Sequence, residues 1–154
     1  MFALFHDIDV KCGYLGAGNR QYRRLSEMLA FNQITLQDEM SFQSFGDLSR
    51  EEAASYDFLF VDIEALGGIL KIFDTLASLR VKHPSVPVIL ISAEFEVDDF
   101  GTTRRVLADV SLRTPILYAS LELALFEATN NNRKCRENVV ELRNYEARLS
   151  SATA

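Results

Sequence analysis

Polar side chains stand at the ends of two strongly apolar segments of the sequence. Residues 56–61 are rich in aromatic and β-branched residues and lead to Asp62, and residues 86–91 form a second apolar run that leads to Ser92. Short runs of this kind are typical of strands that are buried in a parallel sheet. Ligands of open parallel sheets bind beyond the carboxyl ends of the strands. Asp62 and Ser92 are therefore the first candidates for a functional site.

Further acidic residues stand near the N-terminus. Residues 2–5 predict a first strand, and His6, Asp7 and Asp9 follow at its end or just beyond it. Carboxylates that met Asp62 at one edge of a sheet would repel one another unless a cation lay between them. Hard divalent cations such as Mg²⁺ prefer oxygen ligands of this type. We therefore expect an acidic metal pocket at this edge.

Alternating strand-like and helix-like segments position these residues. Apolar residues recur at helical spacing over 69–79, so the two apolar runs and this helix form one βαβ unit with a right-handed crossover. The same patterns predict helices at 20–29, 48–55 and 100–112, and strands at 40–45 and 115–119. Five βα steps indicate a doubly wound α/β domain, in which helices cover both faces of an open five-stranded parallel sheet.

The C-terminal region is expected to be helical beyond the last strand. Ser120 is a candidate N-cap for a helix that begins at Leu121, and residues 133–149 are again helical in pattern. The triplet Asn130–Asn132 is the plausible interruption between them. We accordingly expect a domain at 1–130 and a C-terminal helical extension at 131–154.

One series of residues in this region has the spacing of a coiled-coil seam. It alternates steps of four and three and comprises Leu121, Leu125, Ala128, Asn132, Cys135, Val139, Leu142, Glu146 and Leu149. A continuous helix would let two copies pair as a homodimer. If the asparagine triplet breaks the helix instead, the apolar residues beyond it would fold back on the domain.

Composition excludes several classes of protein. The 154 residues are 48% hydrophobic and 25% charged, as in an average soluble domain, and the net charge of −6 disfavours direct binding of nucleic acid. The two cysteines are far apart and have no metal-ligand or redox spacing, so we expect reduced thiols. Acids soon after the start do not suit a signal peptide, and no apolar stretch is long enough to span a membrane. We expect a cytoplasmic protein.

The segment 58–63 resembles the third strand of the receiver domain of bacterial response regulators, where an apolar run ends in the phosphorylated aspartate. Receivers carry Thr or Ser at the end of the next strand about thirty residues later, and Ser92 follows Asp62 by 92 − 62 = 30 positions. The resemblance covers roughly residues 1–130. It implies a flavodoxin-like fold and a non-enzymatic role in two-component signal transduction.

The resemblance also implies roles for individual residues. Asp62 would accept a phosphoryl group from a histidine kinase or phosphotransfer protein, and Ser92 would be the switch hydroxyl. Asp7, together with His6 or Asp9, would stand for the acidic pair that holds Mg²⁺ beside Asp62, and Glu64 could add its backbone carbonyl. The phosphorylated surface would then act on a protein partner.

The sequence departs from the receiver pattern where the family has a lysine before a proline at the end of the fifth strand. If Pro115 is matched to that proline, Thr114 takes the place of the lysine, and if residues 116–119 are the fifth strand, Ala119 or Ser120 does. The guanidinium of Arg113 is no simple substitute for an ammonium. A second interpretation is therefore a degenerate receiver that binds proteins or dimerises without phosphorylation.

A glycine-rich stretch suggests a third interpretation. Gly13, Gly16 and Gly18 could cradle a phosphate of a flavin or nucleotide at the start of a helix. Their order is GxxGxG and not the dinucleotide-binding GxGxxG, so a flexible loop after the first strand is the simpler interpretation.

Overall fold

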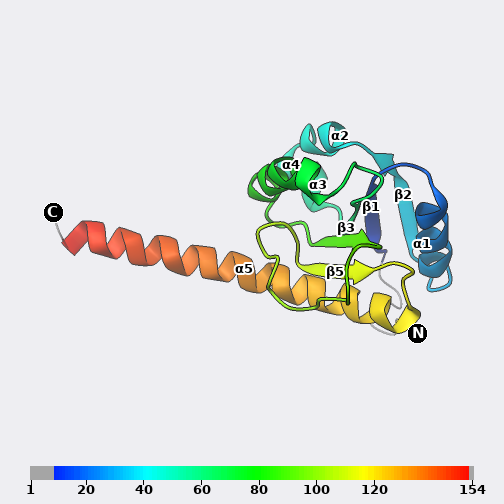
Figure 1. Cartoon of the computed structure of the whole chain (residues 1–154). Helices are drawn as coiled ribbons and strands as arrows, with labels where there is room; N and C mark the ends of the chain where they lie inside the picture. The colour runs from blue at the N-terminus through cyan, green and yellow to red at the C-terminus, as the bar shows by residue number, and fades with distance from the viewer. Residues whose placement is uncertain (1–8, 153–154) are drawn as a thin grey trace.

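A parallel five-stranded sheet forms the centre of the protein. The computed structural model describes residues 9–152, apart from the side chain of Asp38 (Figure 1). The strand order is β2-β1-β3-β4-β5, which is a doubly wound topology. The strands are β1 (Lys11–Leu15), β2 (Thr35–Met40), β3 (Phe58–Asp62), β4 (Val88–Ser92) and β5 (Val110–Arg113). The predicted fold class is thus confirmed.

Helices cover both faces of the sheet (Figure 1). On one face, α1 (Arg20–Ala30) and the first half of α5 (Tyr118–Ala152) pack on the aromatic side chains of β1 and β3. On the other face lie α2 (Phe42–Gly46), α3 (Arg50–Ala54) and α4 (Ile69–Lys82). Each face therefore has its own apolar core. None of the helices in the described part of the chain is both long and apolar enough to cross a membrane.

Side-chain caps set where three of the helices begin. Asn19 accepts a hydrogen bond from the backbone N–H of Tyr22 at the start of α1. Ser41 and Ser49 do the same at the starts of α2 and α3. Such caps satisfy N–H groups that have no partner inside the helix.

The first strand of the sheet differs from the sequence prediction. The segment predicted as a strand, residues 2–5, lies outside the described residues, and β1 occupies part of the stretch that was expected to be a glycine-rich loop. Gly13 lies inside β1, where an added Cβ would stand 3.1 Å from side-chain carbons of both Leu59 and Tyr56. Gly13 therefore allows close packing within the sheet, and it lies in a strand and not in the expected loop.

Three other predicted elements are also wrong. Residues 40–45 are not a strand, because β2 ends at Met40 and the Ser41 cap starts a helix. No helix forms over 100–112, where Asp99 instead makes an antiparallel bridge to Ser111 and β5 begins at Val110. Residues 115–119 are not the last strand but lead into α5, which begins at Tyr118 and not after a Ser120 cap.

The long helix α5 runs unbroken through the asparagine triplet. Asn131 donates hydrogen bonds to the carbonyls of Phe100 (2.8 Å) and Asp109 (2.9 Å), and Asn132 donates to the carbonyl of Pro84 (2.9 Å). Both asparagine side chains are buried, so they fasten the helix to the domain and do not interrupt it. The predicted helix break is therefore wrong, and α5 is continuous across the position expected as a domain boundary.

Candidate functional site

The carboxylate of Asp62 lies at the end of β3 and is 2% exposed. Its Oδ2 atom accepts hydrogen bonds from the Tyr14 hydroxyl at 2.5 Å and from Asn19 Nδ2 at 3.0 Å. Its Oδ1 atom accepts one from the backbone N–H of Ala65 at 3.2 Å. Both carboxylate oxygens therefore already have donors from the protein.

Two neighbouring elements supply these donors. Tyr14 stands in β1 opposite Phe60 of β3, so its side chain lies on the same face of the sheet as Asp62, two residues further along β3. Asn19 follows the turn after β1, and its amide oxygen caps α1 while its amide nitrogen bonds Asp62. The N-cap of α1 thus also fixes the carboxylate.

The Tyr14 hydroxyl is held in its protonated form. Burial raises its pKa most, and the hydrogen bond and negative charge of Asp62 raise the pKa further, with smaller contributions from Glu39 and Glu64. A protonated phenol next to a carboxylate is a permanent donor across the physiological pH range. Tyr14 therefore bonds Asp62 under all ordinary conditions.

This arrangement predicts a loss of stability in alkali. An unfolded tyrosine loses its proton near pH 10, whereas the raised pKa keeps folded Tyr14 protonated. Stability should be full below about pH 10 and fall as the pH rises above it. The free energy of unfolding, measured in urea between pH 8 and pH 11, tests this trend, because this range spans the pKa of free tyrosine at about 10. The Tyr14→Phe variant should show a weaker decline, and an identical decline would contradict the prediction.

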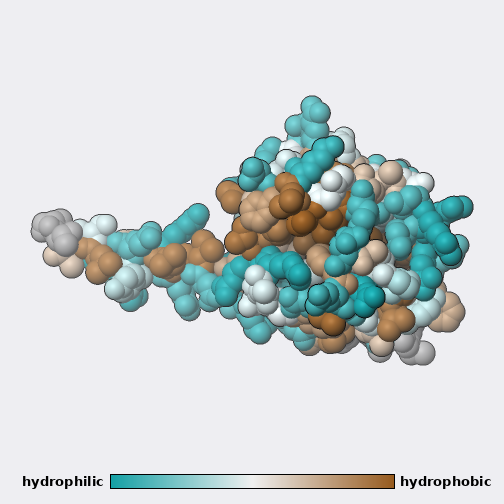
Figure 2. Space-filling view, in the orientation of Figure 1, coloured by the Kyte–Doolittle hydropathy of each residue, from teal (hydrophilic) through white to brown (hydrophobic). Residues whose placement is uncertain are grey.

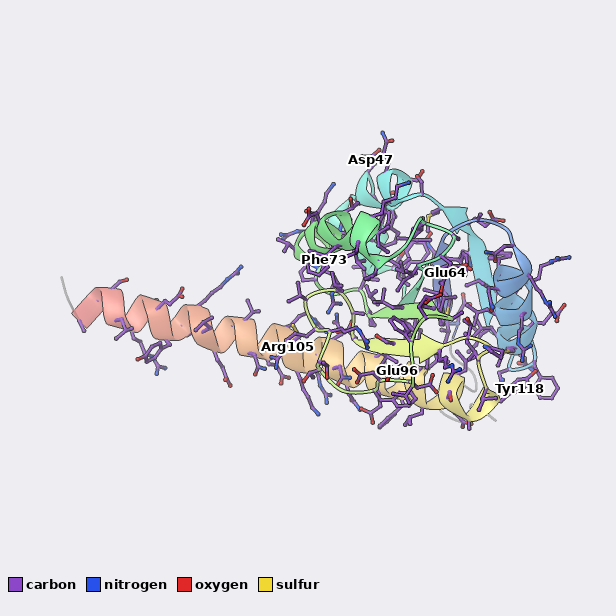
Figure 3. All side chains as sticks on the ribbon, in the orientation of Figure 1. Asp47, Glu64, Phe73, Glu96, Arg105 and Tyr118 are labelled. Carbon is purple, nitrogen blue, oxygen red and sulfur yellow. The ribbon has the colours of Figure 1, made fainter. Side chains whose placement is uncertain are left out.

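The predicted switch residue Ser92 bonds a different acid. Its hydroxyl donates to Glu64 Oε1 at 2.7 Å, and the same Glu64 oxygen accepts from the N–H of Ala93 at 2.8 Å. Ser92 Oγ in turn accepts from the N–H of Glu94 at 3.0 Å. Figure 3 shows Glu64 near the tip of β3. Glu64 therefore joins the ends of β3 and β4 through its carboxylate.

The position expected for the family's lysine carries no cation. Thr114 directly follows β5, is buried, and donates its backbone N–H to the Ser92 carbonyl at 3.1 Å. Its peptide bond to Pro115 is cis. The guanidinium of Arg113 donates to the carbonyl of Glu96 at 2.9 Å. Neither residue provides the ammonium that would pair with a phosphorylated aspartate.

Of the acids predicted to hold Mg²⁺ together with Asp62, Asp9 lies far from it. Asp9 precedes β1 and so lies at the opposite edge of the parallel sheet, which makes its predicted convergence with Asp62 wrong. Asp7 is outside the described residues. Between residues 9 and 152, no group of three His, Cys, Asp or Glu side chains is placed to hold a metal ion.

The turn after β1 has no space for an acid in place of Gly16. This residue has φ +156°, and an added Cβ would stand 2.9 Å from Tyr14 Cε1 and 3.0 Å from Asp62 Cβ. Any side chain there would be strained and would collide with the bonded pair. Residues 16–19 contain no acid, so the turn after β1 brings no carboxylate to Asp62.

Comparisons with known proteins bear on the fold. The sequence matches no family model and no curated protein. The signal receiver domain of an HD domain-containing protein from Pseudomonas fluorescens is similar in structure, with a TM-score of 0.59 and 17% identity over 84% of this chain and 93% of that one. The chain has the fold of a response-regulator receiver domain.

Two further neighbours show how varied proteins with this fold are. A pilus assembly protein (cpaE) from Burkholderia thailandensis has a TM-score of 0.59 and 18% identity, over 80% of this chain and 99% of that one. A response regulator from Burkholderia pseudomallei, solved with a phosphorylated aspartic acid and a calcium ion, has a TM-score of 0.55 and 15% identity, over 86% and 75%. At these identities the likeness concerns the receiver fold alone.

Sequence reasoning missed Tyr14 and Asn19, which contact Asp62 most closely. Asn19 could have been found, because an asparagine directly before an amphipathic helix is a typical N-cap. Tyr14 could not, because its strand contains a lysine and a glycine and was interpreted as loop.

Proposed function

We propose that this protein is a receiver-like signalling domain that binds protein partners without phosphorylation of Asp62. The observation that carries the proposal is the set of three donors on the Asp62 carboxylate. It favours the degenerate receiver over the phosphorylated one among the sequence-based interpretations. The receiver fold and its generally non-enzymatic use in signalling fit this role.

The hydrogen bonds oppose phosphoryl transfer to Asp62. An attacking carboxylate oxygen must be free to meet the phosphorus in line, and positive charge must offset the charge that develops on the transferred group. Here Oδ2 is held by Tyr14 and Asn19, and Tyr14 is a fully buried side chain. Positions 113 and 114 offer no ammonium beside the site.

The same residues offer a different use of the pocket. Asp62 connects β3 to β1 and to the start of α1 through Tyr14 and Asn19, while Glu64 connects β3 to β4 through Ser92. The loops at this edge of the sheet are therefore held in one arrangement. A fixed surface of this kind suits constitutive binding of a protein, and the two free thiols suit the cytoplasm.

Intact-mass measurement after incubation with acetyl phosphate and Mg²⁺ tests the proposal. We expect no added phosphoryl group, while a phosphorylatable receiver treated in parallel gains one. A phosphoryl group on the wild-type protein that is absent from Asp62→Asn would overturn the proposal.

The flavin or nucleotide alternative receives no support from the glycines. Gly13 is part of β1, and an added Cβ at Gly18 would meet the carboxylate of Glu39, which would repel a phosphate. A bound chromophore in the purified protein would reopen this alternative.

A further inference from the structure

The second half of α5 leaves the domain and exposes its apolar side chains. Figure 1 shows this segment projecting from the body of the molecule, and every residue from 136 to 152 is exposed. Figure 2 shows apolar residues between hydrophilic ones along it. The exposed large hydrophobic residues of the segment are Val139, Val140, Leu142, Tyr145 and Leu149. The alternative that these residues fold back on the domain is therefore wrong.

The seam predicted from the sequence divides into two parts at Cys135. Leu121, Leu125 and Ala128 are fully buried against the sheet, and buried Asn132 bonds the domain. Cys135 is half-buried, and the seam residues beyond it are exposed. Because a helix in water gains most of its stability from packing an apolar face, burial of the exposed apolar side chains at Val139 and Leu142 would stabilise this part of the helix.

We propose that a second copy of the chain binds this segment as a parallel, in-register, two-stranded coiled coil. The seam consists of Cys135, Val139, Leu142, Glu146 and Leu149, in the helix that the structure shows continuous from Tyr118 to Ala152. This inference rests on the proposed function, since it names one protein partner of a domain that acts by protein binding.

The seam residues favour two strands. With Leu142 and Leu149 at the d positions of a heptad, Val139 and Glu146 stand at the a positions. A β-branched residue at a combined with leucine at d favours parallel dimers over larger assemblies. Glu146 is the exception, because in an in-register dimer it faces its own copy.

The flanking charges favour the parallel orientation. In this heptad Arg143 and Ser150 stand at e positions, and Asn138 and Tyr145 stand at g positions. In a parallel pair each e position faces a g position of the partner, so Arg143 faces Asn138 and Ser150 faces Tyr145. In an antiparallel pair e faces e, and Arg143 would meet either itself or Arg136 of the other helix. Like charges in contact are unfavourable. Parallel pairing avoids this repulsion and places both domains at the same end.

Disulfide cross-linking tests the register and orientation. In a Cys135→Ser background, Leu142→Cys should form an intermolecular disulfide on mild oxidation, because the two copies of position 142 meet in the seam. Cys12 should not react, since it is fully buried and its pKa is raised to about 12 by burial and by the charge of Asp57. Val140→Cys in the same background is the control, because position 140 is equally exposed but points away from the seam.

Cross-linking that is absent, or equal at positions 142 and 140, would contradict the proposed coiled coil. A 154-residue chain that stays monomeric in sedimentation up to hundreds of micromolar would contradict it as well. Neither result would alter the outcome of the phosphorylation test, which reports on Asp62 alone.

Substitution of Glu146 provides a second test, because its effect on dimerisation distinguishes a specific seam from an exposed helix that associates non-specifically. Glu146→Leu removes two facing carboxylates from the seam and should tighten dimerisation about tenfold or more, which is at least about 1.4 kcal/mol. Glu141→Leu adds the same side chain outside the seam and should leave the dissociation constant unchanged. Equal effects of the two substitutions would point to non-specific association and overturn the proposal.

Discussion

Replacement of Asp109 by alanine is expected to lower the free energy of unfolding by about 3–5 kcal/mol. Asp109 is 2% exposed and forms a bidentate pair with Arg80, at 2.6 and 2.9 Å. It also accepts a hydrogen bond from the backbone N–H of Val88 at 2.8 Å. Its removal leaves Arg80, which is 8% exposed, as a buried charge without its carboxylate.

The measurement is urea unfolding of the wild-type protein and two variants. The matched control is Asp99→Ala, because the Asp99 carboxylate lies 3.4 Å from Arg104 and both side chains are partly exposed. Loss of this pair should cost less than about 1 kcal/mol. Equal losses for the two variants would show that burial does not set the strength of these ion pairs.

The Arg80–Asp109 pair is also connected to α5 by hydrogen bonds of Asn132. Asn132 Nδ2 lies 3.4 Å from Asp109 Oδ2, and Asn132 Oδ1 accepts a hydrogen bond from Arg136 Nε at 3.0 Å. The buried pair, the asparagine and the start of the free helix are thus connected. Because this network fixes where the helix leaves the domain, it also fixes how two domains would be placed by a coiled coil.

The central strands could be predicted from the sequence, and the flanking ones could not. Every residue of β3 and β4 is buried, so both strands appear as continuous apolar runs. β1 is equally buried except at Lys11, but Lys11 at its start and Gly13 within it interrupt the apolar run that would predict a strand. β5 is short and contains Ser111, whose backbone bonds Asp99 in a bridge that no local pattern reveals.

The asparagine triplet illustrates a similar limit. Asparagine has a low helix propensity and often ends a helix, so a break at Asn130–Asn132 is the natural prediction from local sequence. The buried carbonyls of Pro84, Phe100 and Asp109 change this outcome, because they need donors that the two inward-facing amides provide. These carbonyls are remote in the sequence, so the tertiary contacts that decide the case are invisible to pattern analysis.

The candidate site shows the same division between local and remote information. Asp62 and Ser92 could be placed at strand ends from the sequence, and the structure has both there. Among the described residues, the side chains that bond Asp62 are the donors Tyr14 and Asn19, and not the expected Asp9. Which residues meet at the end of β3 depends on the register between β1 and β3. The sequence patterns did not predict β1, so this register could not be predicted either.

Asp62→Asn is expected to destabilise the protein by about 1–3 kcal/mol, because a buried donor then loses its acceptor. Three donors point at the carboxylate, and an amide offers only one acceptor oxygen. Whichever way the amide turns, its NH₂ group faces either the N–H of Ala65 or the side-chain amide of Asn19. The sign of this change in stability distinguishes a carboxylate held by donors from a cluster of repelling carboxylates. In a cluster of repelling carboxylates, the same neutralising substitution would stabilise the fold.

A double-mutant cycle with Tyr14→Phe sharpens this prediction. If the bond between Tyr14 and Asp62 is the main contact of the carboxylate, the two substitutions should be strongly non-additive in urea unfolding, since both remove the same interaction. Tyr22→Phe combined with Asp62→Asn is the additive control, because the Tyr22 hydroxyl bonds a carbonyl elsewhere. A gain in stability on Asp62→Asn, or additive effects with Tyr14→Phe, would mean that the carboxylate is not held by its donors. Asp62 would then be free for the chemistry that its position at the end of β3 first suggested.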